Sequence, residues 1–195
     1  MFNDRSSTLA LLRTRRSGRP RDMVEPGPTA DELRQILEIA MRTPDHGKLH
    51  PWRFVHVAGD QRDAFAELLQ RAYRIDNPEP GRLEVEATER FARQAPELVV
   101  ALSSPTLGHK IPVWEQELSC GAAVMNLHLA AHALGYVAGL VTGWAAYSDA
   151  VLAAFGAPPE RIAGFIFIGT AGAELEERLR PLYEEVVSSW LPPAK

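Results

Sequence analysis

The chain has 195 residues, of which 46% are hydrophobic and 24% charged, and its formal net charge is -4. These values describe an ordinary soluble surface around one sizeable core, so we expect a single domain over residues 1–195. A chain with net negative charge repels polyanions, which argues against nucleic acid as a partner.

Hydrophobic periodicity predicts helices and strands in alternation along the chain. Ser7 or Thr8 caps the first helix, and Thr29 with Glu32 forms a capping box ahead of the second. The 84–94 helix is the more polar and should face solvent, whereas the apolar strand that follows it should be covered on both faces. The predicted helices are 8–14, 30–42, 64–74, 84–94, 114–134, 149–155 and 183–189, and the predicted strands are 54–57, 98–102, 136–142 and 164–169.

This pattern predicts the fold class. About four strands among six or more helices indicate an α+β fold or a mixed α/β sandwich, with a central sheet. No GxGxxG turn follows a strand and no GxxxxGK[ST] loop occurs, which argues against Rossmann dinucleotide-binding and P-loop proteins.

Cysteine usage and hydropathy bear on the compartment. The single cysteine, Cys120, cannot form an internal disulfide, which fits a reducing compartment. The first residues lack the basic and apolar stretches of a signal peptide, so we expect a cytoplasmic protein. Residues 118–148 contain no Asp, Glu, Lys or Arg, but histidines and glycines interrupt them. We therefore interpret this segment as a buried helix and a buried strand, and expect no membrane span.

A short loop between residues 41 and 54 concentrates polar side chains. Pro44 and Pro51 stop helix on both sides and make the loop stiff. Polar groups on a stiff loop generally serve a ligand rather than a core. The polar side chains of this loop are Arg42, Asp45, His46, Lys48 and His50.

A second polar cluster follows the first predicted helix. Arg15, Arg16 and Ser17 offer two guanidinium groups and a hydroxyl, which can bind a phosphate in bidentate fashion. A solvated basic turn is the alternative interpretation. Further basic groups come from Arg42, Arg178 and Arg180, which favours a bound phosphate compound.

Other chemistry has weaker support. His128 and His132 are four residues apart, the spacing at which two imidazoles on a helix share a metal ion, but no third ligand is evident. We therefore interpret them as interior or interface histidines and expect no metal. Cys120 lies among apolar residues that should raise its pKa, and no serine occupies a Gly-x-Ser-x-Gly elbow, so no nucleophile is indicated.

Taken in order, these motifs resemble the nitroreductase family, in particular its small members. The similarity extends from about Leu9 to Thr170, and the ordered set is more specific than any one segment. It rests on residues 15–17, 40–46, 51–54, 113–117, 121–125 and 164–170.

The resemblance implies a central mixed, mainly antiparallel sheet, with FMN as cofactor and a homodimer that holds two flavins at its interface. NADH or NADPH would reduce the flavin, and a nitroaromatic, a quinone or another electron-poor small molecule would then take the electrons. Because FMN carries the redox chemistry, no side chain is expected to act as catalyst. A flavin-binding carrier or sensor without turnover, on the same fold, is the alternative.

The resemblance also implies which residues hold the phosphate side of FMN. These are Arg15, Arg16 and Ser17, with Arg180 as a late basic residue near the same phosphate. The apolar, charge-free segment 118–148 would lie buried in the dimer interface.

Two further groups of residues are implied around the flavin. Arg42 and His46 would reach the flavin that is bound largely by the partner subunit. Leu140, Val141 and Thr142 align with a triplet that contacts the cofactor. Because Leu140 and Val141 carry neither ring nor charge, we expect hydrogen bonds there only from backbone groups and the Thr142 hydroxyl.

Overall fold

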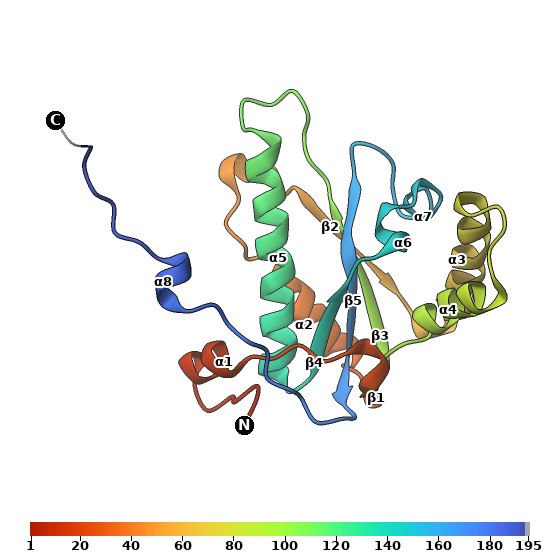
Figure 1. Cartoon of the computed structure of the whole chain (residues 1–195), viewed down its shortest axis with the longest axis horizontal. Helices are drawn as coiled ribbons and strands as arrows, with labels where there is room; N and C mark the ends of the chain where they lie inside the picture. Colours follow the sequence, from red (N-terminus) through yellow and green to blue (C-terminus); the bar gives the residue numbers. More distant parts are fainter. Residues whose placement is uncertain (194–195) are drawn as a thin grey trace.

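The structure is a computed structural model that describes residues 1–193. A five-stranded sheet lies between two helical layers, with α5 and α2 on one face and α3, α4, α6 and α7 on the other (Figure 1). The helices are α1 (Thr8–Thr14), α2 (Ala30–Ala40), α3 (Arg62–Asp76), α4 (Arg82–Ala92), α5 (Val113–Leu134), α6 (Trp144–Tyr147), α7 (Asp149–Leu152) and α8 (Tyr183–Val186). The strands are β1 (Met23–Val24), β2 (Trp52–Val57), β3 (Glu97–Ser103), β4 (Val137–Val141) and β5 (Arg161–Ala171).

The sheet is built around β5. Its strand order is β1-β5-β3-β2, and β4 pairs with β5 beside β1. Every strand pair is antiparallel, which confirms the mainly antiparallel sheet expected from the sequence. The sequence predicted four strands because β1 has only two residues, too few for a period-two pattern to show. One edge of β4 stays free of strand pairing, and this edge positions the site described below.

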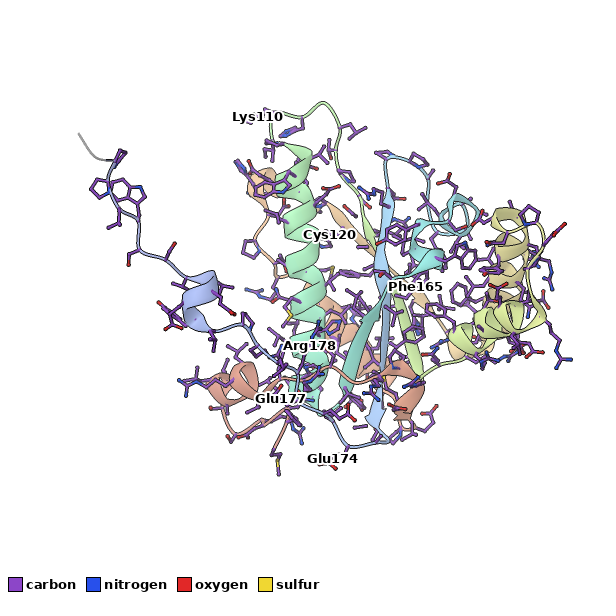
Figure 2. All side chains as sticks on the ribbon, in the orientation of Figure 1. Lys110, Cys120, Phe165, Glu174, Glu177 and Arg178 are labelled. Atoms are coloured by element: carbon purple, nitrogen blue, oxygen red, sulfur yellow. The ribbon has the colours of Figure 1, made fainter. Side chains whose placement is uncertain are left out.

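Two hydrophobic cores fill the spaces on either side of the sheet. Alternate residues of β5 point to opposite faces, so Ile166 packs toward α5 while Phe165 packs toward α3 and α4. The Phe165 ring lies between the sheet and these two helices (Figure 2), with its centroid 5.3 Å from that of Phe91. Strand β3 is completely buried from Leu98 to Leu102, which confirms that both of its faces are covered.

Several predicted boundaries need correction. Helix α4 does not simply face solvent, because Thr88 and Ala92 are buried and Phe91 packs on the sheet. Helix α2 ends at Ala40 rather than near residue 42. Directly after its end, the Thr43 hydroxyl donates to the Ala40 carbonyl, and Pro44 follows. Helices α7 and α8 are shorter than predicted. The sequence did not predict α6, because this four-residue helix begins directly after Gly143.

The C-terminal segment leaves the body of the molecule. After β5, residues 172–181 cross the lower ends of α1 and α5, and α8 then stands apart from the sheet and helices (Figure 1). Its apolar side chains are exposed. Among residues 1–193, no helix combines the length and the apolarity needed to cross a bilayer.

Candidate cofactor site

Residues 15–18 leave α1 and run along the free edge of β4. Ser7 caps α1, and the Asn3 side chain holds Arg16 through both of that residue's backbone groups. The Gly18 N–H then donates to the Ala138 carbonyl across 3.2 Å. A Cβ atom at Gly139 would lie 2.5 Å from the Gly18 carbonyl oxygen, so glycine is required at this crossing.

Three guanidinium groups gather where this segment begins. Arg15 donates to the Ser17 hydroxyl across 3.2 Å. Partial burial, followed by the positive charges of Arg180 and Arg16, lowers the pKa of Arg15. Within residues 1–193, no carboxylate lies within 4.0 Å of the Arg15 or Arg16 guanidinium, and Arg180 has only Glu177, at 3.6 Å. An anion bound here would relieve the mutual repulsion of these groups.

The C-terminal segment forms the outer wall of this cluster. The Arg16 Nε donates to the backbone carbonyl of Glu176 across 2.6 Å, and Arg19 pairs with the Glu176 carboxylate at the same distance. The pocket that residues 16–19 and 173–176 line has a volume of only about 40 Å³. Figure 2 shows Arg178 and Glu177 where the segment passes the lower end of α5. Arg16 therefore anchors the C-terminal segment, whereas Arg15 keeps its charge unpaired.

The free edge of β4 continues beyond this crossing. Both backbone groups of Ala138 point away from β5. Its N–H donates a hydrogen bond to His132, and its carbonyl accepts one from the Gly18 N–H. In an antiparallel pair the backbone direction alternates, so the backbone groups of Leu140 point to the same free edge. Thr142 follows directly after the end of β4. The Leu140 side chain is 44% exposed, while Val141 packs into the α3–α4 core. Of the three residues predicted to contact the cofactor, Val141 therefore has its side chain in the core rather than at the free edge of β4.

Two histidines lie beneath the crossing of residues 15–18. His128 and His132 are buried on α5, which confirms their interior position, and their rings meet edge to face at 6.2 Å between centroids. The Nε2 of His132 accepts from Ala138, whereas its Nδ1 and the Nε2 of His128 have no hydrogen-bond partner in the described chain. Burial and then the Arg15 charge lower the pKa of His128 to about 4. Burial, followed by His128 and Arg15, lowers the pKa of His132 to about 3.

The described residues supply no third metal ligand beside these two histidines. Over residues 1–193, no group of three or more His, Cys, Asp or Glu side chains could hold a metal ion. The buried imidazoles stay neutral, because their depressed pKa values lie well below physiological pH.

The loop after α2 lies along another side of α5. The Asn126 amide donates to the Thr43 hydroxyl across 2.7 Å, and the His46 Nδ1 lies 2.8 Å from the Glu115 carboxylate. Gly47 has φ +79°, and a Cβ atom there would lie within 2.4 Å of the Ile111 side chain, so the turn requires glycine. The side chains of Arg42 and His46 are both exposed.

Helix α5 keeps His46 away from the guanidinium cluster. His46 lies at Glu115, and the histidines beneath Arg15 begin at His128. Along an α-helix this separation is about 20 Å at about 1.5 Å per residue. The structure therefore brings Arg15, Arg16, Ser17 and Arg180 together at one end of α5, and His46 lies toward the other end.

Comparison with known proteins decides the family. The sequence model of the Nitroreductase family matches residues 12–170. The chain belongs to the nitroreductase family. A Haemophilus influenzae protein named "Putative NAD(P)H nitroreductase" is 38% identical over 173 residues, 87% of this chain and 91% of the relative. The Escherichia coli protein "Putative NAD(P)H nitroreductase YdjA" is 34% identical over 163 residues, 83% of this chain and 87% of the relative.

Solved structures agree with the nitroreductase fold. A nitroreductase-like family protein from Bacillus cereus has a TM-score of 0.79 at 19% identity and covers 94% of this chain and 95% of its own. A Bacteroides fragilis nitroreductase with bound FMN has a TM-score of 0.70 at 23% identity and covers 93% and 98%. At such identities the likeness establishes the fold of this nitroreductase.

The arrangement fits the flavin mononucleotide that the sequence resemblance implies. The guanidinium cluster suits a phosphate, and the backbone groups of Leu140 at the free edge of β4 suit the polar rim of a flavin ring. Sequence reasoning missed the contribution of Gly18 and Ala138, which join these two ends. It also did not predict that His128 and His132 lie beneath this crossing, although polar residues spaced four apart in an apolar helix are a detectable signal.

Proposed function

We propose that this nitroreductase is an FMN-dependent NAD(P)H oxidoreductase, one domain over residues 1–195, that reduces small electron-poor molecules such as nitroaromatics or quinones. The observation that carries the proposal is the guanidinium cluster around Arg15. No carboxylate of residues 1–193 lies within 4.0 Å of the Arg15 guanidinium, and the cluster adjoins the free edge of β4. The names of its relatives from Haemophilus influenzae and Escherichia coli support the same activity.

Each part of the site has a separate task in this proposal. Arg15, Ser17 and Arg180 bind the phosphate through charge-assisted hydrogen bonds. The backbone groups of Leu140 and Thr142 orient the ring. FMN, when bound, supplies the ability to accept hydride from NAD(P)H and pass it on, so the chain's own residues bind and orient rather than exchange protons.

The apolar surface that one chain leaves uncovered supports a homodimer. Along α5, Trp114, Leu118 and Met125 form an exposed stripe on one helical face. The C-terminal segment adds a second exposed apolar set, comprising Leu179, Leu182, Tyr183, Val186, Val187, Trp190 and Leu191. We propose that a partner subunit covers both, and that Arg42 and His46 of each subunit approach the flavin of the other.

The decisive experiment is spectroscopic. The purified protein should be yellow. Under anaerobic conditions, the addition of NADH or NADPH should bleach its flavin absorption. A nitroaromatic or a quinone should then restore the absorption, at a rate that depends on the acceptor concentration. The Arg15→Ala variant, after removal of free flavin, is the control for signal that arises from unbound cofactor.

The outcomes separate the reductase from its alternative. Bleaching followed by reoxidation supports the reductase. A yellow protein whose flavin neither nucleotide reduces contradicts the reductase and supports a flavin-binding carrier or sensor. A colourless protein that cannot be reconstituted with FMN overturns both.

A further inference from the structure

A pocket opens between α3, α4 and the segment that follows β4. Its volume is about 350 Å³, within the range of roughly 300–1,000 Å³ that ligand pockets occupy. Helices α3, α4 and α6 lie together on this side of the sheet (Figure 1), and each contributes one aromatic side chain to the lining. These side chains are Tyr73, Phe91 and Trp144. A pocket of this size and lining suits a ligand of one or two aromatic rings.

The chain itself holds the aromatic walls in place. The rings of Tyr73 and Trp144 meet edge to face at 4.8 Å between centroids, and the Trp144 Nε1 donates to the Asp76 carboxylate across 2.9 Å. On the core side, the Phe91 ring packs edge to face against Phe165 at 5.3 Å. Because these rings are already ordered, a ligand that binds between them loses little affinity to side-chain ordering.

The rim of the pocket is acidic. Glu84 lines it, and Asp76 lies at the Trp144 ring nitrogen. Desolvation, followed by the charge of Glu84, raises the pKa of Tyr73, so this carboxylate acts on the pocket wall. Among residues 1–193, those that line the pocket include no lysine or arginine. The rim therefore repels an anion, whereas aromatic faces and carboxylates suit a neutral or cationic ring.

Thr142 joins this pocket to the proposed cofactor edge. It follows directly after the end of β4 and lines the pocket together with Val141. The backbone groups of Leu140, two residues before Thr142, face the free edge of β4. Two residues of extended chain span about 7 Å. A ring in the pocket would therefore lie close to the place proposed for the flavin ring.

Resting on the proposed function, we propose that this pocket binds the aromatic ring of the electron-poor acceptor, and that its acidic rim selects neutral or cationic acceptors over anionic ones. Apolar side chains such as Leu69 and Val141 remove water from the ring, and the aromatic walls offer edges and faces for stacking. Nitro and quinone groups are uncharged, so the selection acts on the other substituents of the acceptor.

The first measurement is ligand binding to the oxidised holoenzyme in the absence of NAD(P)H, by isothermal titration calorimetry. Three ligands share the nitrobenzene ring and differ in charge near neutral pH. The first, para-nitrobenzyl alcohol, is neutral, para-nitrobenzylamine is cationic and para-nitrobenzoate is anionic. The alcohol and the amine should bind more tightly than the benzoate, because only the benzoate meets like charge at the rim.

A matched pair of substitutions tests the location. Ala87 is exposed on α4 and lines the pocket, so the indole of Ala87→Trp would occupy the space of the ligand. This variant should bind the alcohol about 10-fold more weakly or not at all. Ala64 is an exposed alanine of α3 outside the pocket lining, and Ala64→Trp should bind all three ligands as the wild type does.

Glu84→Gln tests the charge separately from the shape. The Glu84 carboxylate accepts from the Gly81 N–H across 2.8 Å, and glutamine can keep this bond at the start of α4. The benzoate should bind about 2- to 5-fold more tightly, the amine should weaken by a similar factor, and the alcohol should not change. Asp60→Asn removes an exposed carboxylate that precedes α3 and should change none of the three.

Kinetics then connects the pocket to the reaction. In Ala87→Trp the KM for the alcohol should rise, while NADH or NADPH should bleach the flavin at the wild-type rate. Equal affinity for the three ligands, unchanged binding or KM in Ala87→Trp, or an equal loss in Ala64→Trp would overturn the assignment. A holoenzyme that binds the ligands in the predicted order but reduces none of them contradicts the proposed function instead.

Discussion

The backbone N–H of Ala138 donates a hydrogen bond to Nε2 of His132 across 3.2 Å. A ring nitrogen that accepts carries no proton, so His132 is neutral with its proton on Nδ1. Protonating this ring would break the hydrogen bond. It would also place a positive charge close to His128 and to the positive charge of Arg15. The contact therefore links the pH of the solution to the stability of the site.

We expect the protein to lose stability as the pH falls from about 7 to about 5. Folding depresses the pKa of His128 to about 4 and that of His132 to about 3, from 6.5 in both cases. The unfolded chain thus binds protons in this window and the folded chain does not, so the free energy of unfolding should fall by about 2 kcal/mol per histidine by pH 5. Urea unfolding of the apoprotein at a series of pH values measures this free energy.

A matched pair of variants assigns this effect. His132→Gln keeps an acceptor for Ala138 but does not titrate, so its stability should depend less steeply on pH. His109→Gln removes an exposed imidazole and should keep the wild-type slope. Equal slopes in the wild type and His132→Gln would show that the buried ring does not govern acid sensitivity.

Arg15 should contribute more to FMN retention than Arg16. A lost charge-assisted hydrogen bond costs about 1.5–3 kcal/mol, so Arg15→Ala should weaken FMN binding by roughly 10- to 100-fold. Arg16→Ala should also weaken retention, but less, because its guanidinium already donates to the Glu176 carbonyl. Flavin occupancy after gel filtration measures both, with the exposed Arg74→Ala on α3 as control. Wild-type occupancy in both variants would contradict the phosphate assignment.

A charge on the α5 stripe should break the proposed dimer. Leu118 is 53% exposed in the single chain, and Leu118→Glu would place an unpaired carboxylate in the interface. Light scattering after gel filtration should show a monomer with reduced FMN content. Leu83→Glu on α4, where leucine is 70% exposed, should stay dimeric. A wild-type monomer that retains flavin would refute the shared site, including the roles of Arg42 and His46.

Cys120 should be unreactive in the folded protein. Burial raises the pKa of its thiol to about 11, and its Sγ lies 3.7 Å from the Leu102 carbonyl oxygen. A chromogenic disulfide reagent near pH 8 should therefore label no thiol until urea is added, because only the thiolate attacks. Cys120→Ala sets the background. Rapid labelling under native conditions would mean that the helix opens locally.

The sequence by itself determined those features that depend on neighbours a few residues apart. The capping box of Thr29 and Glu32 formed as predicted, because its partners are three residues apart. The buried strand after residue 97 and the long apolar helix were recognisable from hydrophobic pattern alone. The order of the motifs likewise predicted the nitroreductase family, which the family comparison confirmed.

Only the tertiary structure decided which polar groups are left unsatisfied. Arg15 and Arg16 are equivalent in the sequence, yet Arg16 donates to a carbonyl 160 residues away, while no carboxylate of residues 1–193 pairs with Arg15. Val141 turned into the core because β4 pairs with β5 in one register. His132 lies beneath residues 15–18 because Ala138 contacts both His132 and Gly18, and His128 packs against the His132 ring. Such contacts join distant segments, so no local pattern records them, and the folded chain alone brings their partners together.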